Sequence, residues 1–406
     1  MTDHVATPRG VLLRHYVGAW WRFTHLRGDA LQHYQDRLAR RTVRAAIAHS
    51  PFYRSLFKAY DVRDWRTLPT TKKQVMMDNF TDLNTRRVPL NLAMETALRA
   101  ERERDFSPLV PRTDLTVGLS SGTSGHRGLF MVSPSERAAW AGALLARTLP
   151  GPLLRRGGWR VAFLHRSGSN LYQSLSSSAI SFNFLDLMTP LDKVVAHLNT
   201  FLPHLLVAPP TMLGLLAGEQ QAGRLKIYPE KVISVAEVLE PQDGLVISNA
   251  FDVSCVHQIY QCTEGLLAVT CSKGHLHLQE DIVAVQTSPL TDKKEGSHAD
   301  GFRVTPIVTD LWRRVQPIIR YRLGDVLVLA PEDEAPCPCG SQFRRVLRVE
   351  GRCDDSLLFP FLHKLTDYRI FFPDTLRRAV LLADPGIADY RVIQESPGSL
   401  RIHLAF

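Results

Sequence analysis

The chain has 406 residues, and its 45% hydrophobic and 22% charged residues are ordinary proportions for a folded globular protein. These proportions exclude global disorder and a coiled coil. No apolar run reaches the roughly 18 residues that a membrane helix needs, residues 1–10 lack the apolar core of a signal peptide, and six cysteines are too few for a secreted disulfide scaffold. We therefore predict a cytoplasmic protein without a membrane span, built as one large domain with an appendage or as two to three ordinary domains.

Positive charge is concentrated at the N-terminus. The 49 Lys and Arg against 40 Asp and Glu give a net charge of +9, of which residues 1–60 hold +7 (ten basic minus three acidic side chains) and the rest +2. Such a basic arm can bind nucleic acid or an acidic partner. Tyr34, Leu38 and Ala45 recur at roughly helical spacing beneath the charges and favour a solvated helix face. Because the chain has no zinc-finger spacing and no aromatic-rich ribonucleoprotein motif, we predict no nucleic-acid partner.

Hydrophobic periodicity predicts helices over about the first 110 residues. The clearest helix runs from Asp29 to Ala48, and Ser50-Pro51 is its expected end. From about residue 115, short β-branched runs alternate with helical stretches. The expected strands are Leu115–Leu119, Arg160–Leu164, His204–Ala208, Lys231–Val235 and Val253–Tyr260, and the expected helices are Glu136–Arg147, Leu191–Phe201 and Thr211–Ala222. After Gly274 the chain becomes strand-rich, with expected strands at Leu276–Val285, Phe302–Thr309 and Ile318–Leu329.

This order of elements predicts an α/β fold. The large N-terminal domain consists of mostly parallel sheets flanked by helices, with a strand-rich subdomain, and a small, shortened α+β unit ends the chain. We expect three parts: residues 1–110 as the helical part of the large domain, 111–351 as its core, and 352–406 as the C-terminal unit. Ligands are expected at the carboxyl ends of the parallel strands.

The segment from Ser120 to Gly128 is dense in hydroxyls and glycine and lies where an expected strand gives way to Leu129 and a helix. Such a loop can place backbone N–H groups and hydroxyls around phosphate oxygens. It is not a Walker loop, because the Gly-Lys-Ser/Thr sequence is absent. Taken alone, the segment is more consistent with a flexible surface loop.

Three later motifs carry further chemistry. Tyr260, Thr263 and Glu264 follow an apolar strand, where a ring can stack on a purine, a hydroxyl can contact phosphate and a carboxylate can hold Mg²⁺. Asp325 lies in a glycine turn and suits a ribose diol, and Arg352 precedes an acidic pair at the start of the last unit. Each motif is a weak signal by itself.

In this order the motifs resemble the adenylate-forming superfamily of acyl-CoA synthetases and adenylation domains. Within it, the chain is similar to the phenylacetate–CoA ligase branch and its deazaflavin-coenzyme-adenylating relatives. Three further segments carry the resemblance to that branch, which spans about residues 30 to 356: Ser50-Pro51-Phe52-Tyr53, Val235-Ala236-Glu237 and Cys337-Pro338-Cys339-Gly340.

The resemblance implies a role for each matching residue. Phosphate-loop positions are Ser121, Gly122, Thr123, Ser124 and Gly125, with Thr123 and Arg127 among the catalytic groups. Ala236 and Glu237 match the segment that lines the adenine, Tyr260 the ring that stacks on it, Thr263 the α-phosphate contact and Glu264 the magnesium ligand. Asp325 matches the ribose-binding carboxylate, Arg352 a second ribose or phosphate contact, and Asp354 the pivot of the small domain.

Two departures from the family pattern stand out. The Lys-Pro-Lys or Lys-Pro-Thr that usually closes the loop is replaced by His126-Arg127-Gly128, so Arg127 is expected to supply the positive charge. Family members also have a C-terminal domain about twice as long, with a lysine near its end, whereas the last lysine here is Lys364. The expectation is a trimmed chain, or slow adenylation without that lysine.

Four residues form a second group of candidate ligands. Cys271, His277, Cys337 and Cys339 offer three thiolates and an imidazole, the ligand set of a closed structural zinc site. Relatives in the resembled branch carry zinc at a comparable place, which favours this interpretation. The alternative is that these are small buried residues with a core histidine.

The resemblance thus implies an enzyme that uses ATP and Mg²⁺ to convert a carboxylic acid into an acyl-adenylate, with release of pyrophosphate. The acyl group then passes to a thiol, most simply CoA. Transfer to a carrier-protein phosphopantetheine or to an amine is the first alternative, and a non-catalytic nucleotide-binding protein is the second. The identity of the acid and a homodimeric state are left open.

Overall fold

The N-terminal quarter of the chain is helical, as expected. The computed structural model describes residues 9–120, 128–166, 175–289, 301–331, 334–352, 357–361, 364–371, 383–384, 387 and 389–405. The first elements are α1 (Arg9–His25), α2 (Gly28–His49), α3 (Pro51–Leu56), η1 (Trp65–Thr67), α4 (Lys73–Asp78), α5 (Phe80–Leu83) and α6 (Leu90–Glu103). Ser50 ends α2 and its hydroxyl accepts the Tyr53 N–H to begin α3, because Pro51 prevents the helix from continuing.

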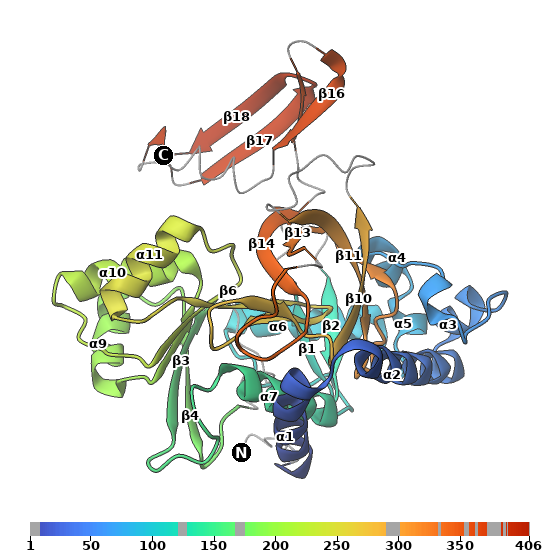
Figure 1. The fold of residues 1–406 in the computed structure, drawn as a ribbon, viewed down its shortest axis with the longest axis horizontal. Helices are drawn as coiled ribbons and strands as arrows, with labels where there is room; N and C mark the ends of the chain where they lie inside the picture. The colour runs from blue at the N-terminus through green and yellow to red at the C-terminus, as the bar shows by residue number, and fades with distance from the viewer. Residues whose placement is uncertain are drawn as a thin grey trace.

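One mixed sheet of twelve strands forms the centre of the molecule (Figure 1). Its parallel half has the order β7-β6-β5-β3-β4, with strands β3 (Trp159–His165), β4 (Ile180–Asp186), β5 (Leu205–Ala208), β6 (Lys231–Val235) and β7 (His257–Cys262). The other half is antiparallel: β8 (Gly265–Thr270), β9 (Leu276–Leu278), β10 (Val283–Pro289), β11 (Phe302–Asp310), β12 (Tyr321–Arg322), β13 (Asp325–Leu329) and β14 (Arg345–Arg352). The predicted α/β class is confirmed, and the strand-rich part continues the same sheet.

Helices cover the parallel strands because the strands are apolar on both faces. On one side, α9 (Leu191–Phe201), α10 (Pro210–Gln221) and α11 (Pro241–Phe251) enclose a core with β3, β5 and β6. A second core includes α7 (Pro134–Thr148), residues of α1 and α2, and strands of both halves of the sheet. The hairpin of β1 (Thr116–Leu119) and β2 (Leu129–Val132) packs with α6 in a third core.

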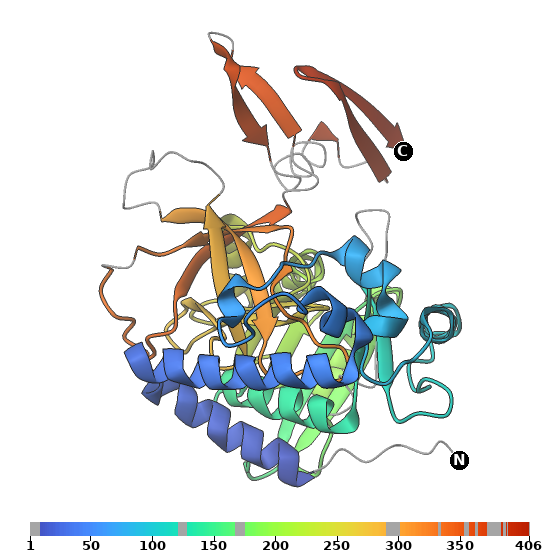
Figure 2. The same cartoon turned by 90° about the vertical axis from the view of Figure 1, so that its right-hand side faces the viewer.

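Helices α1, α2 and α7 lie in one layer at the end of the molecule opposite the C-terminal strands (Figure 2). The approach of α1 to α7 depends on Gly142, because a β-carbon there would lie 2.3 Å from the Leu12 carbonyl oxygen. Arg147 of α7 crosses this layer and binds the buried Asp281 carboxylate at 2.9 Å. A second arginine, Arg22 of α1, contacts the same carboxylate at 2.9 Å.

Three strand predictions were wrong in their bounds. Val253–Tyr260 starts as a strand only at His257. Leu276–Val285 is two strands, because the chain turns at residues 279–282 to place Gln279 and Asp281 against the buried Arg147 guanidinium. Ile318–Leu329 is likewise divided into β12 and β13, with Gly324 between them.

The C-terminal strands form two separate antiparallel hairpins beyond the main body (Figure 1). These are β15 (Leu357–Phe361) with β16 (Lys364–Phe371), and β17 (Asp389–Ser396) with β18 (Ser399–Ala405). Between these hairpins the structure describes only residues 383, 384 and 387, so the expected helices of this unit are not tested, and the domain boundaries at 110 and 351 stay predictions. Among the described helices, none combines the length and apolar character required to cross a bilayer.

Candidate active site

A two-residue turn presents the central polar groups. Strands β7 and β8 pair antiparallel with Cys262 opposite Gly265, so Thr263 and Glu264 form the turn between them. The Thr263 hydroxyl donates to Glu264 Oε2 at 2.9 Å. Because β7 is the last parallel strand, this turn lies at the carboxyl edge of the parallel half, where open α/β sheets bind ligands.

The segment after β6 lies beside this hairpin. β6 and β7 are parallel with Val235 opposite Ile259, so the following residues, Ala236 and Tyr260, are neighbours at the same edge. Ala236 has a left-handed backbone with φ of 67°, an uncommon conformation for a residue with a β-carbon, and its side chain is exposed. The chain therefore leaves the sheet abruptly next to Tyr260.

Glu237 follows in this turn, and helix α10 orients its side chain. The carboxylate accepts hydrogen bonds from the Thr211 hydroxyl and, at 3.4 Å, from the Thr211 backbone N–H in the first turn of α10. The structure thus brings Ala236 beside Tyr260 but directs the Glu237 carboxylate toward the helix.

Tyr260 and Asp325 are in direct contact. The Tyr260 hydroxyl donates a hydrogen bond to the Asp325 carboxylate, and Asp325 lies opposite Arg352 in the register of β13 and β14. Burial, and then the Asp325 charge, raise the pKa of Tyr260 well above its ordinary value. The phenol therefore stays protonated and acts as a donor that fixes the carboxylate. Three of the predicted nucleotide-binding residues, from three strands, thus lie together.

The carboxylates of Glu264 and Asp325 both lie in this partly buried region. Burial raises the pKa of the Tyr321 phenol, and the nearby Glu264 carboxylate raises it further. Burial also raises the pKa of the Cys262 thiol well above its ordinary value, with contributions from Glu264 and Asp325. Cys262 is therefore a protonated packing residue rather than a nucleophile. The proximity of the Glu264 and Asp325 carboxylates to Cys262 places two negative charges in this region, which suits a cation.

The sequence did not point to Arg313, which supports the turn from behind. Its guanidinium donates to the Thr263 carbonyl oxygen at 2.6 Å and to Gln316 Oε1 at 3.2 Å. The Asp310 carboxylate accepts the Trp312 and Arg313 backbone N–H groups at 2.7 and 2.8 Å. Arg313 is buried, with 7% of its surface exposed, so these contacts hold the turn in place. No motif in Asp-Leu-Trp-Arg-Arg could have identified this residue.

The predicted phosphate loop joins two antiparallel strands. Leu119 of β1 lies opposite Leu129 of β2, the Ser120 N–H donates to the Gly128 carbonyl at 2.8 Å, and the Gly128 N–H donates to Ser120 Oγ at 2.7 Å. A strand thus stands between the loop and α7, where the sequence predicted a helix soon after Leu129. The loop positions lie outside the described residues: Ser121, Gly122, Thr123, Ser124, Gly125, His126 and Arg127.

Lys73, the first residue of α4, lies at the mouth of this loop. A β-carbon built on Gly128 would come within 3.1 Å of Lys73 Cε, so the lysine stem packs against the glycine. No sequence motif identifies this lysine. It adds a positive side chain beside the segment in which Arg127 is the expected cation.

The four predicted zinc ligands meet in space. The ligand atoms of Cys271, His277, Cys337 and Cys339 all lie within 4.8 Å of one another. The Cys271 and Cys337 sulfurs are 3.9 Å apart, and Cys339 Sγ lies 3.7 Å from His277 Nε2. Three members are buried and Cys339 is half-buried. Such a closed S₃N set matches structural zinc sites.

The surroundings of this cluster favour metal binding. His277 Nδ1 lies 2.7 Å from the Phe343 carbonyl oxygen, which can only accept, so Nδ1 carries the proton and Nε2 is left to face the sulfurs. Hydrogen bonds from the Cys339 side chain and from the Lys273 backbone N–H lower the pKa of the Cys271 thiol, which favours its thiolate. The cluster lies beyond the last residue of β8, at the end opposite the Thr263–Glu264 turn.

No protein-family model and no curated protein matches the sequence. Among solved structures, the fold is similar to a 2-hydroxyisobutyryl-CoA ligase in an open conformation in complex with 2-HIB-AMP and CoA, with 17% identity, a TM-score of 0.62, and coverage of 95% of this chain and 86% of that chain. The same ligase in the postadenylation state with R3-HIB-AMP gives 16% identity, a TM-score of 0.65, and coverage of 94% and 79%.

A third similar structure is the acyl acid amido synthetase AtGH3.15 in complex with 2,4-DB, with 14% identity, a TM-score of 0.55, and coverage of 94% of this chain and 78% of that chain. The chain has the fold of this CoA ligase and of this acyl acid amido synthetase. The expected resemblance to that superfamily is confirmed at the level of the fold. The phenylacetate–CoA ligase branch stays a prediction.

Proposed function

We propose that this chain activates a small carboxylic acid with ATP and Mg²⁺, as an AMP-forming ligase. The observation that carries the proposal is the convergence of Tyr260, Thr263, Glu264 and Asp325 at the carboxyl edge of the parallel strands. The similar ligase structures are complexes with acyl-adenylates, which supports the same intermediate here.

In this proposal the adenosine of ATP binds against Tyr260 and Ala236. The exposed Ala236 lines the base and the Tyr260 ring stacks on it, while Asp325 accepts hydrogen bonds from the ribose hydroxyls. The Tyr260 hydroxyl keeps the Asp325 carboxylate in one orientation before the nucleotide arrives, and Arg352 is the adjacent cation in β14. Glu237 contributes through its backbone, because its carboxylate is engaged with Thr211.

Glu264 is the residue that would hold Mg²⁺. A carboxylate oxygen is the ligand type that Mg²⁺ prefers, and the two carboxylates of Glu264 and Asp325 near Cys262 fit a cation at this place. When bound, Mg²⁺ neutralises charge on the ATP phosphates. Thr263 is the proposed α-phosphate contact, and the loop residues 121–127, with Thr123 and Arg127 foremost, are proposed to surround the outer phosphates together with Lys73.

The reaction then follows from positioning and charge. A carboxylate oxygen of the substrate attacks the α-phosphorus in line, the bond from that phosphorus to the bridging oxygen of the β-phosphate breaks, and pyrophosphate leaves with the electron pair. The chain's contribution is to hold the two reactants at this edge and to place Thr263, Arg127 and Lys73 against the developing charge. Acyl transfer follows when a nucleophile attacks the acyl carbon and AMP departs.

CoA is the proposed acceptor. The ligase neighbour binds CoA, whereas the other neighbour is an amido synthetase, so a carrier-protein phosphopantetheine or an amine is the alternative acceptor. Zinc at the Cys271 cluster is proposed as a structural ion that holds the antiparallel half of the sheet. A cytoplasmic location and a homodimer stay predictions.

ATP–pyrophosphate exchange over a panel of aryl and alkyl carboxylic acids tests the proposal. We expect acid-dependent exchange, lost in an Asp325→Ala variant and retained in Asp243→Ala, a control at an exposed position of α11. Acids that support exchange are then offered with CoA, a phosphopantetheinyl carrier or amines to identify the acceptor. Tight ATP binding without exchange for any acid would instead identify a non-catalytic nucleotide-binding protein.

A further inference from the structure

Helix α1 presents an apolar stripe to solvent. Leu13, Val17, Trp20 and Trp21 are 54, 54, 58 and 48% exposed, and their spacing places them along one face of the helix. The opposite face of α1 packs on α7, where Ala19 is fully buried. Since large apolar side chains grouped on a surface mark an interaction site, this face needs a partner.

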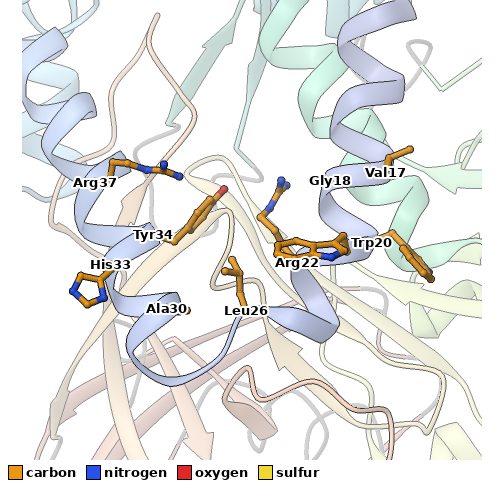
Figure 3. A pocket seen from close by; sticks show the side chains of 10 residues that line it. Val17, Gly18, Trp20, Arg22, Leu26, Ala30, His33, Tyr34 and Arg37 are labelled. Carbon is orange, nitrogen blue, oxygen red and sulfur yellow. The ribbon is translucent and has the colours of Figure 1, made fainter.

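A groove beside this stripe runs between α1 and α2 (Figure 3). Val17, Leu26 and Ala30 supply apolar lining, and Tyr34 of α2 closes it. Arg37 of α2 is exposed at the groove (Figure 3), whereas the Arg22 guanidinium is directed to the buried Asp281 carboxylate at 2.9 Å. Trp21 also lines it and stacks on His25 with a ring separation of 4.9 Å. The groove therefore combines apolar walls with a cationic rim.

Positive charge surrounds the stripe. Arg14 on α1 and Arg37, Arg41 and Arg44 on α2 are exposed, and residues 1–60 carry +7 of the net charge of +9. An anionic partner is therefore attracted to this face. A second copy docking face to face would oppose these arginines to themselves, which argues against a dimer through this surface.

The geometry favours a flat partner over a helix in the groove. Trp20 and Trp21 line the groove, whereas Leu13, at the N-terminal end of the stripe, does not, so a helix seated in the groove would leave that end of the stripe uncovered. A flat surface can contact both helices at once, because they lie in one layer at the edge of the molecule (Figure 2). The C-terminal hairpins lie at the opposite end, so docking through α1 and α2 would leave them free (Figure 1).

We propose that the α1–α2 face, consisting of Leu13, Val17, Trp20, Trp21 and the arginines of α2, binds the surface of an anionic lipid bilayer. Tryptophan side chains favour the boundary between head groups and acyl chains, and arginines beside them bind the lipid phosphates. Apolar insertion and charge attraction together give reversible peripheral binding. The proposal is independent of the adenylating function and requires no spanning helix.

Vesicle co-sedimentation with the full chain tests this proposal. The vesicles contain phosphatidylcholine alone, or phosphatidylcholine with about one third phosphatidylglycerol. We expect binding to the anionic vesicles that weakens as salt is raised, because salt screens the charges. A Trp20→Ser/Trp21→Ser variant and an Arg37→Glu/Arg44→Glu variant should each lower the partition coefficient at least about tenfold.

Matched controls carry the same changes elsewhere. Leu215→Ser/Leu245→Ser removes two apolar side chains of α10 and α11 that are 53 and 65% exposed, and Lys193→Glu/Lys226→Glu reverses two exposed charges. Both controls should bind as the unmodified chain does. Quenching of the unmodified protein's tryptophan fluorescence by brominated lipid is a second measurement that does not depend on the variants folding, and we expect it with anionic vesicles.

Three results would overturn the proposal. The first is absence of both sedimentation and quenching with anionic vesicles. The second is equal losses in the control and test variants. The third is a chain that does not bind vesicles but binds an acidic amphipathic peptide, with that binding abolished in Trp20→Ser/Trp21→Ser. This result would assign the face to a protein partner. Because ATP–pyrophosphate exchange can be measured without lipid, failure here is distinguishable from failure of the proposed enzymatic function.

Discussion

The two ends of strand β8 carry polar clusters of opposite character. At its start, the Thr263–Glu264 turn is half-buried and its carboxylate faces hydroxyl and phenol partners. Just beyond its end, Cys271 joins His277, Cys337 and Cys339 in a set of which three members are buried. The first cluster keeps an accessible, negatively charged surface, whereas the second is enclosed by protein.

This difference indicates that the two ends of β8 have different roles, ligand binding at the Glu264 end and stability at the Cys271 end. Four protein ligands fill a tetrahedral site and leave no position for a substrate, so we infer a structural role for the Cys271 end. At the Glu264 end, carboxylates are oriented by neighbours but not covered, as a site that receives a ligand from solvent requires. Changes at the two ends should therefore affect different measurements: stability at one end, ligand binding and rate at the other.

The largest effect is expected at the Cys271 end. Purified protein should contain about one equivalent of zinc, and Cys339→Ser or chelation should lower the free energy of unfolding by about 4 kcal/mol or more, because metal binding contributes directly to folding. Elemental analysis and thermal melts with and without added zinc measure this. Cys255→Ser, which removes a half-buried cysteine outside the cluster, is the control. Zinc-free protein with an unchanged melting temperature would show that these are packing residues.

The next effect concerns nucleotide affinity at the opposite end. Asp325→Ala should weaken AMP binding by about 1–3 kcal/mol, the cost of losing hydrogen bonds to a charged group. Tyr260→Phe keeps the ring but removes the donor to Asp325, so its cost should be smaller, about 1 kcal/mol. Calorimetric titration with AMP checks both. Equal affinities in all three proteins would remove Asp325 and Tyr260 from the nucleotide site.

Several candidate site residues could be named from the sequence because Thr263 and Glu264 directly follow a strand, and the roles of these residues stay predictions. The order of motifs brought Tyr260, Glu264 and Asp325 into one prediction, and in the structure the Tyr260 hydroxyl of β7 reaches the Asp325 carboxylate of β13, with Glu264 in the turn after β7. The Cys-x-Cys spacing similarly predicted a cluster that the structure assembles. The side-chain chemistry of such residues indicates a role even before the fold is known.

Other features could not be predicted, since they depend on tertiary contacts of common residues. Arg313 is one of two consecutive arginines, and only the fold shows that it binds the Thr263 carbonyl oxygen. Lys73 belongs to a short helix far in sequence from Gly128. The break between β9 and β10 depends on the buried pair of Arg147 and Asp281, whose partners are 134 residues apart. No local pattern encodes these pairings.

Arg313 allows a more specific test of the Glu264 end of β8, because its side chain contacts the Thr263 carbonyl oxygen. Arg313→Met removes the hydrogen bond to the Thr263 carbonyl oxygen, so the turn should lose its fixed geometry and the exchange rate should fall about tenfold, or about 1.4 kcal/mol, with little change in the Michaelis constant for ATP. Arg313→Lys should recover part of the rate. The adjacent Arg314 contacts Thr42 and Leu311, so Arg314→Met is the matched control for stability. Equal rate losses in both variants at matched folded fractions would indicate a structural role alone.

The last prediction concerns His15 of α1, whose ring contacts Trp312 next to Arg313. Its ring lies 4.5 Å from the Trp312 ring, edge to face, and Trp312 precedes Arg313. Burial, aided by Arg14 and Arg22 and opposed by Asp281, lowers the pKa of His15 to about 4. In the unfolded chain the imidazole titrates near its ordinary value of about 6.5.

The sign of the pH dependence follows from these two values. Above about pH 6.5 His15 is neutral in both states, and its contribution to stability is complete. As the pH falls toward about 4, the unfolded chain takes up a proton that the folded chain resists, so the free energy of unfolding decreases. Because the side chain is only partly buried, we expect a loss of about 1–2 kcal/mol over this interval.

His15→Phe keeps a ring against Trp312 without a titrating group, so urea melts between pH 7 and 4 should show a shallower slope than in the unmodified chain. His49→Phe, at an exposed position of α2, should leave the slope as it was; if His15→Phe does the same, the α1–Trp312 contact does not contribute to the acid sensitivity of this protein.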